Sequence, residues 1–102
     1  MTLAFDNKEL RKICENKEYA ASLYDGSIVE TLLERLADIE AADNPLELLT
    51  GSPCEIIYKG KNCYKVNITN DIRIIFTTST KKSNNTDWSC VNRVKILNIE
   101  SL

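Results

Sequence analysis

The hydrophobic residues of this chain change their spacing once, at Gly51-Ser52-Pro53. Before this point they recur three and four positions apart, which is the period of an α-helix with one buried face. After it they alternate with polar residues, which is the period of a strand with one buried face. A chain with helices first and strands second predicts an α+β fold, in which an antiparallel sheet packs against an N-terminal helical hairpin.

The first half predicts one short strand and two helices. Residues 3–5 form an apolar stretch that suits a strand, and residues 8–24 follow a helical period that Asp25-Gly26 ends. Ser27 and Glu30 have the spacing of a capping box, so a second helix is predicted to start there. The short link between the two helices favours an antiparallel hairpin, and a further helical turn precedes the sheet.

The second half predicts four strands. Two short turns, the first at Gly60, and a polar loop over residues 77–90 separate them. The predicted strands cover residues 54–59, 61–69, 72–76 and 91–99. In the last of these Arg93, Lys95 and Ile99 share one face, and the pattern leaves open whether that face is buried.

The length and the hydrophobic content fit one domain over residues 1–102. A chain of 102 residues with 43% hydrophobic residues can bury a single core but not two. No apolar stretch approaches the roughly 18 residues that a membrane span needs, and the N-terminus lacks the basic start and apolar run of a signal peptide. We therefore expect a cytoplasmic protein without a membrane partner.

Metal and cofactor chemistry finds no support in the sequence. The chain has no histidine, and no two of its cysteines form a C-x-x-C pair. The four cysteines are Cys14, Cys54, Cys63 and Cys90. We expect them to be buried and reduced. Nucleophilic triads, histidine acid–base pairs and phosphate-binding glycine loops are missing too, so we expect neither a metal nor a cofactor.

The net charge of −2 hides an asymmetry between the two halves. Residues 1–50 carry 5 basic and 11 acidic side chains, whereas residues 51–102 carry 8 basic and 4 acidic ones. The cations that are predicted to project from strands and turns, with two tyrosines among them, are Lys59, Lys61, Lys65, Arg73, Arg93, Lys95, Tyr58 and Tyr64. Such a cluster could bind an RNA backbone, or it could be the solvated face of an ordinary antiparallel sheet.

RNA cleavage is also within the reach of these residue types. Attack by the 2′-hydroxyl of the RNA needs no enzyme nucleophile, but only a base, cations beside the phosphorane and an acid. Arg73 lies inside an otherwise apolar strand and needs an anionic partner, which could be a phosphate, Asp71 or a helix carboxylate. Trp88 is predicted to pack over the sheet edge.

Three short motifs resemble one protein family. The segment from Tyr64 to Phe76 resembles the aromatic-x-V-x-x-x-x-x-x-R-I-x-F signature of the RelE/ParE toxin superfamily, in its HigB-like or killer-protein branch. Phe5 and Leu10-Arg11-Lys12 resemble the F-x-x-x-x-L-R-K start of that branch, and residues 87–97 are similar to its D-W-x-x-V-x-R-I-K-I-L ending. The resemblance covers essentially the whole chain.

This resemblance implies a RelE-like toxin of a bacterial type II toxin–antitoxin system. Its antitoxin partner would be a helix-turn-helix protein of the HigA type, and its activity a ribosome-dependent mRNA endonuclease, or mRNA interferase. Arg73 would stabilise the phosphorane, and Lys59 and Lys61 would hold phosphates or move a proton. The further candidates for RNA binding are Lys65, Tyr64, which could stack on a base, Arg93 and Lys95.

The C-terminus departs from the family pattern. Relatives tend to end in an I-E-D-Y-H-like tail whose tyrosine or histidine takes part in catalysis, whereas this chain ends in Ile99-Glu100-Ser101-Leu102. Two non-enzymatic alternatives therefore stay open. One is a ParE-like poison of DNA gyrase, and the other is a degenerate toxin that only binds its antitoxin.

Overall fold

The computed structural model describes residues 1–78 and 87–102. In chain order, with η for a short 3-10 helix, its elements are β1 (Thr2–Phe5), α1 (Lys8–Glu15), α2 (Lys17–Leu23), α3 (Gly26–Ala41), η1 (Pro45–Glu47), β2 (Cys54–Tyr58), β3 (Lys61–Asn67), β4 (Ile72–Thr78), η2 (Trp88–Cys90) and β5 (Arg93–Ser101). The predicted order of helices first and strands second is confirmed. Of the predicted polar loop at 77–90, residues 79–86 lie outside the described residues.

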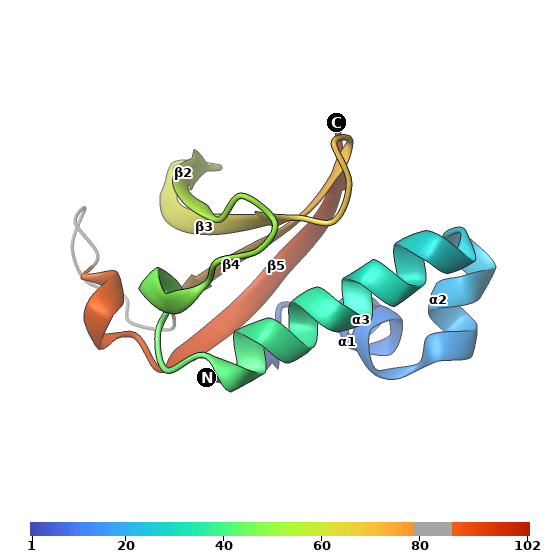
Figure 1. Ribbon diagram of the computed structural model, residues 1–102, viewed down its shortest axis with the longest axis horizontal. Helices are drawn as coiled ribbons and strands as arrows, with labels where there is room; N and C mark the ends of the chain where they lie inside the picture. The colour runs from blue at the N-terminus through green and yellow to red at the C-terminus, as the bar shows by residue number, and fades with distance from the viewer. Residues whose placement is uncertain (79–86) are drawn as a thin grey trace.

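The strands form one five-stranded sheet in the order β1-β5-β4-β3-β2. Neighbours from β5 to β2 are antiparallel, while β1 runs parallel to β5. Figure 1 shows the three helices on one side of the sheet, with β2 and β3 curled away from α3. The α+β fold is therefore confirmed. It differs from the prediction in one pair of strands, since β1 and β5 are parallel. The helices α1 to α3 lie between β1 and the other four strands in the sequence, so β1 is not joined to a neighbour by a hairpin.

The predicted helix over residues 8–24 is two helices, because Asn16 interrupts it. The Asn16 backbone is extended, and its side-chain oxygen accepts a hydrogen bond from the Tyr19 amide at 3.0 Å. The Asn16 amide still donates to the Lys12 carbonyl, so this residue ends α1 and caps α2. An asparagine side chain competes with the backbone for hydrogen bonds in this way, and the period alone does not reveal it.

The predicted capping box at Ser27 and Glu30 is wrong. Helix α3 begins at Gly26, with Asp25 at the N-cap position and no side-chain cap hydrogen bond. Ser27 therefore lies inside the helix, where its carbonyl accepts a hydrogen bond from the Thr31 hydroxyl at 3.0 Å. Gly26 adopts a helical position instead of ending the preceding helix, which has already ended at Leu23.

The core lies between the helices and one face of the sheet. The helices contribute Leu10, Ile13, Ala20, Val29, Leu32, Leu36 and Ile39, and the sheet contributes Tyr64, Val66, Ile74, Phe76, Val94, Ile96 and Ile99. We call the opposite face, which none of the described helices covers, the open face. No helix among residues 1–78 and 87–102 is long and apolar enough to cross a membrane.

A register shift in β5 decides which of its residues are buried. Phe76 pairs with Ile96, but Ile75 pairs with Asn98, so one residue of β5 is left over between them. Side chains after this bulge change face, as a one-residue insertion requires. Ile99 is consequently buried in the core while Arg93 and Lys95 lie on the open face, so the predicted sharing of one face is wrong.

The four cysteines are free thiols, as expected, but their burial differs from the prediction. Cys63 is buried and Cys14 is partly buried, whereas Cys54 and Cys90 are exposed. Burial raises the pKa of Cys14 to about 12, with Glu15 adding to the effect. Burial also raises the pKa of the Cys63 thiol, so neither of these two sulfurs is a thiolate at neutral pH.

Candidate functional site

The cations that the sequence singles out meet on the open face, because side chains alternate along each strand. The strand register places Asn67, Arg73 and Glu100 in one row across β3, β4 and β5. The next row contains Lys65, Ile75 and Asn98. The candidate site consists of seven side chains on the open face, namely Tyr58, Lys61, Lys65, Asn67, Arg73, Asn98 and Glu100.

Arg73 is paired with a carboxylate of the last strand. Its Nε donates to Glu100 Oε1 at 2.9 Å, and its Nη2 lies 2.7 Å from the same oxygen. About a quarter of each side chain is exposed, 23% for Arg73 and 26% for Glu100. The expected anionic partner therefore exists within the chain, and it is Glu100, not Asp71 or a helix carboxylate.

Tyr58 reaches across the open face to the same strand. Its hydroxyl oxygen accepts a hydrogen bond from Asn98 Nδ2 at 3.0 Å, although β3 and β4 lie between β2 and β5 in the sheet. The phenol therefore passes above two open-face residues on those strands, Cys63 and Ile75, both of which are fully buried. Asn98 and Glu100 are two residues apart on one face of β5, so Tyr58 and Arg73 are anchored side by side, roughly 7 Å apart along the strand.

The two other predicted catalytic residues lie at the adjacent hairpin. Lys59 and Gly60 have φ angles of 50° and 77°, which are the left-handed values of a two-residue hairpin turn. Lys59 Nζ lies 5.4 Å from the centre of the Tyr58 ring, and Lys61 pairs with Tyr58 across the strands. Lys65, farther along β3, donates to Asn67 Oδ1 at 3.2 Å. Lys59 and Lys61 therefore flank Tyr58 at the hairpin, whereas Lys65 lies toward Arg73.

Two of the predicted RNA-binding cations lie at the far end of the same face. Lys95 pairs with Thr77 and makes an ion pair of 3.2 Å with Asp6, and Arg93 pairs with Thr2 of the edge strand. Lys95 is five residues from Glu100, so roughly 15 Å of strand separates it from the Arg73 pair. These two cations share the surface of the candidate site but not its centre.

Tyr64 lies on the helix-covered face. Its ring stacks on Phe76 with 5.7 Å between centroids and meets the edge of Trp88 at 5.2 Å, and only 8% of the residue is exposed. Burial raises the pKa of the Tyr64 phenol. Its position suits a core residue and does not suit stacking on a base.

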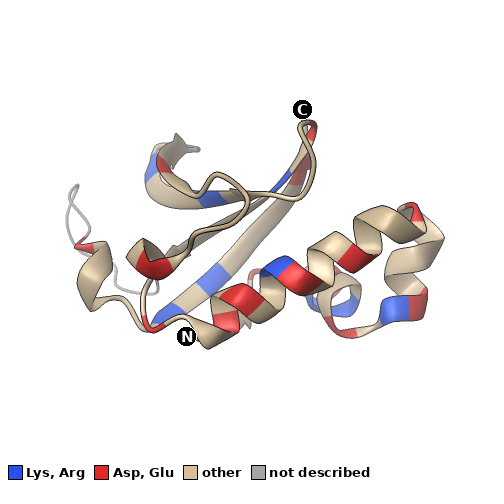
Figure 2. Cartoon of the chain, in the orientation of Figure 1, with Lys and Arg blue, Asp and Glu red and all other residues tan. Residues whose placement is uncertain are grey.

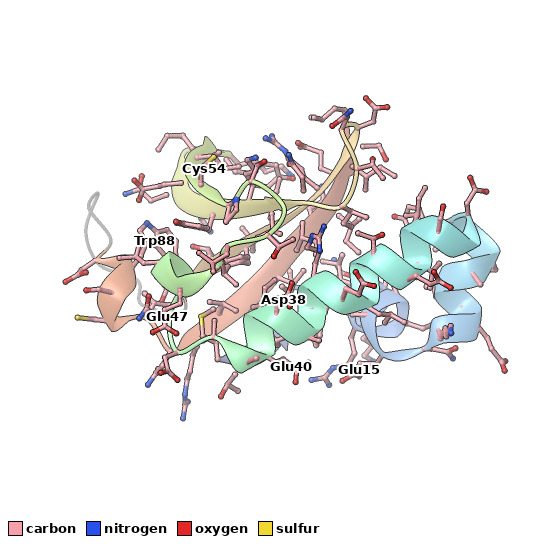
Figure 3. The ribbon with its side chains drawn as sticks, in the orientation of Figure 1. Glu15, Asp38, Glu40, Glu47, Cys54 and Trp88 are labelled. Atoms are coloured by element: carbon pink, nitrogen blue, oxygen red, sulfur yellow. The ribbon has the colours of Figure 1, made fainter. Side chains whose placement is uncertain are left out.

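Trp88 confirms its predicted packing role. It is buried, and its indole N–H donates to the Glu55 carboxylate of β2. Figure 3 labels Trp88 where η2 approaches η1. This arrangement closes the core at the hairpin end of the sheet.

Tyr58, Asn98 and Glu100 are three further candidates for this site. The sequence places Tyr58 among the cations without assigning it a role, and it predicts no role for Asn98 or Glu100. The alternation of Tyr58 with the rest of β2 was a usable signal for its face, whereas the pairing of Glu100 with Arg73 depends on the register of β5.

Charge is divided between the two layers as the sequence suggests. Figure 2 shows mostly acidic residues (red), with a basic one (blue) among them, along α3, and basic residues on the strands; Figure 3 labels Asp38 and Glu40 on α3 and Glu47 on η1. Within the described ranges no three metal-ligating side chains cluster. The open face can therefore bind an anion through its cations, with a phenol and a carboxylate beside them.

Comparison with known proteins identifies the fold. No protein-family model matches the sequence, and no curated protein is similar to it. The YoeB/ParE toxin from Agrobacterium tumefaciens matches with a TM-score of 0.64 and 13% identity over 100% of this chain and 99% of that chain. A YoeB-YefM complex from Staphylococcus aureus matches with a TM-score of 0.63 and 17% identity over 100% and 97%. The chain therefore has the YoeB/RelE-like toxin fold.

Proposed function

We propose that this chain is the toxin of a bacterial type II toxin–antitoxin system and acts as a ribosome-dependent mRNA endonuclease. The observation that carries the proposal is the position of Arg73. It is a partly exposed cation on the open face of a toxin-like fold, with Tyr58 and Lys65 near it and two lysines on the adjacent hairpin. The fold similarity extends over the whole chain, which supports one toxin domain over residues 1–102.

In the proposed reaction the cations bind the phosphates of the RNA and stabilise the negative charge of the phosphorane. Arg73 neutralises the charge that develops on the phosphorane, which is commonly the largest single contribution to such catalysis. Lys59 and Lys61 hold the neighbouring phosphates at the hairpin, and Lys65, Arg93 and Lys95 extend the contact along the RNA backbone. The mechanism requires neither a metal nor a cofactor, because the 2′-hydroxyl is the nucleophile.

The partners follow from the same proposal. The toxin would bind a cognate antitoxin, and the S. aureus toxin of similar fold is seen in complex with YefM. Assignment to the HigB-like branch, with a HigA-like helix-turn-helix antitoxin, rests on the sequence motifs at residues 64–76 and 87–97. Its targets, the ribosome and mRNA, would place it in the cytoplasm.

The Arg73–Glu100 pair favours the non-enzymatic alternatives. The Glu100 carboxylate already pairs with the Arg73 guanidinium, so a phosphate would have to compete for this cation. A protein in which that pair only stabilises the sheet would be a non-enzymatic binder, either a gyrase poison or a degenerate toxin that binds only its antitoxin.

Induced expression in a bacterial host tests the proposal. We expect the wild-type chain to arrest growth and cut mRNA, and we expect Arg73→Ala to lose both effects while remaining folded. Arg11→Ala is the matched control, since Arg11 is an exposed arginine on α1 that pairs with Glu15. It should behave as wild type.

Three other results would contradict the endonuclease proposal. Growth arrest with intact mRNA and inhibited supercoiling would indicate a gyrase poison. Absence of toxicity with a stable antitoxin complex would indicate a degenerate toxin. Unchanged toxicity of Arg73→Ala would remove Arg73 from the site.

A further inference from the structure

The cations of the open face leave the 2′-hydroxyl of RNA cleavage without a group that accepts its proton. The 2′-hydroxyl must lose a proton as it attacks, and the leaving 5′-oxygen must gain one. Arginine stays protonated, and lysine is a cation at neutral pH, so neither readily accepts a proton. Among the described residues around Arg73, a carboxylate and a phenol are present, namely Glu100 and Tyr58.

Glu100 is held in a form that can accept a proton. Both contacts from Arg73 fall on Oε1, at 2.9 Å from Nε and 2.7 Å from Nη2. Neither contact from Arg73 involves Oε2, so this second oxygen can face a substrate hydroxyl. With 26% of its side chain exposed, the carboxylate is accessible from the open face.

Tyr58 is held in a form that can donate a proton. Asn98 Nδ2 donates to its hydroxyl oxygen, so the tyrosine is the acceptor in that bond and its own O–H proton is left for another partner. The same amide would stabilise the phenolate that forms when this proton leaves. The phenol is thus both positioned and polarised by β5.

The spacing of the two groups suits a phosphodiester between them. Asn98 and Glu100 project from the same face of β5, roughly 7 Å apart. The phenol is fixed at the first residue and the carboxylate is the second, with the Arg73 guanidinium beside the carboxylate. A base and an acid on opposite sides of one phosphate, with a cation against it, is the arrangement that in-line attack requires.

We propose that Glu100 is the general base and Tyr58 the general acid of RNA cleavage at this site. This inference rests on the endonuclease function proposed above. Glu100 takes the proton of the 2′-hydroxyl while that oxygen forms its bond to phosphorus. The bond from phosphorus to the 5′-oxygen breaks, and this oxygen takes the phenolic proton of Tyr58. The products are a 2′,3′-cyclic phosphate and a 5′-hydroxyl, and water returns the proton from Glu100 to the phenolate.

The substitution Glu100→Gln separates a base from a structural partner. Glutamine keeps an oxygen that accepts from Arg73, so the position of the guanidinium is preserved, but its amide cannot take up the proton. We expect cleavage of mRNA on ribosomes to fall at least about 100-fold, within the range of general base catalysis. Glu30→Gln, on the exposed side of α3, is the control and should keep the wild-type rate.

A modified substrate separates the acid from the base. When the 5′-oxygen at the cleavage site is replaced by sulfur, the leaving group needs no proton. Tyr58→Phe should therefore be about 100-fold slow on the ordinary mRNA and close to wild type on the 5′-thio mRNA. Glu100→Gln should be slow on both, because its defect lies at the 2′-hydroxyl.

Each outcome bears on a definite claim. Full activity of Glu100→Gln in a folded protein would overturn the base assignment, and a Tyr58→Phe defect that the 5′-thio mRNA does not relieve would overturn the acid assignment. In both cases wild-type cleavage would leave the endonuclease function standing. A wild-type chain that cleaves neither mRNA would instead contradict the endonuclease function itself, and this inference with it.

Discussion

At the scale of single residues, the Arg73–Glu100 pair adds little to stability. A partly exposed ion pair contributes on the order of 1 kcal/mol or less, because water screens it. Two apolar side chains at these positions of β4 and β5 would stabilise the sheet at least as well. The pair therefore contributes little to holding the strands together, which fits the anion binding and proton transfer proposed for it.

Gly51 is the residue whose substitution should cost most among the glycines. Its φ is +86°, and an added Cβ would lie 2.7 Å from both the Asn67 carbonyl oxygen and Val66 Cγ1. Asn67 also donates its amide to the Gly51 carbonyl at 2.6 Å, so neither backbone can move away freely. We expect Gly51→Ala to lower the free energy of unfolding by about 2 kcal/mol or more, measured by urea denaturation.

Gly26→Ala is the matched control for this substitution. Gly26 lies in the first turn of α3, and no atom lies within 4 Å of an added Cβ. Alanine favours helix over glycine by up to about 1 kcal/mol, so the control should be neutral or slightly stabilising. Equal losses for both variants would show that the contact with Asn67 does not set the cost.

The alternation of apolar and polar residues predicted which face of the sheet a side chain lies on, where the strand was regular. Tyr64 alternates with Lys65 and shares the face of Val66, so the pattern itself implies that Tyr64 is buried. The partner of Arg73 could not be found in this way. Glu100 is 27 residues away in the sequence, and its position opposite Arg73 depends on a bulge that no local motif signals.

At the scale of elements, periodicity predicted which segments form strands and helices but not where the helices break. The break at Asn16 and the start of α3 at Gly26 both depend on hydrogen bonds of single residues, which a hydrophobic period does not record. The strand pairing across the sheet was predicted as antiparallel, and only β1 differs.

Asn16→Ala tests the break between α1 and α2. It removes the side-chain oxygen that caps α2, and loss of such a cap costs about 1 kcal/mol. We expect a reduction of that size in the free energy of unfolding, measured by urea denaturation. Lys17→Ala, at the next and exposed position, is the control. Unchanged stability of Asn16→Ala would mean that the helical segment does not depend on this cap.

At the scale of the whole molecule, the division of charge and the fold point to the same surface. The helical half carries 11 of the 15 acidic side chains and its helices cover one face of the sheet, so the described cations of the strands lie on the other face. Net charge could not predict this, because the two layers nearly cancel. The toxin-like fold could be predicted from three short motifs, whereas the proposed proton-transfer groups could not, because the sheet brings them together from distant parts of the chain.

The most direct test of the central claim is mRNA cleavage by the purified chain on translating ribosomes. We expect the wild-type protein to cut mRNA on the ribosome and to leave a 5′-hydroxyl end, and we expect Arg73→Ala to be at least about 100-fold slower with its thermal unfolding curve unchanged. Intact mRNA with the wild-type protein, or equal cleavage by Arg73→Ala, would contradict the assignment of the open face as a ribonuclease site.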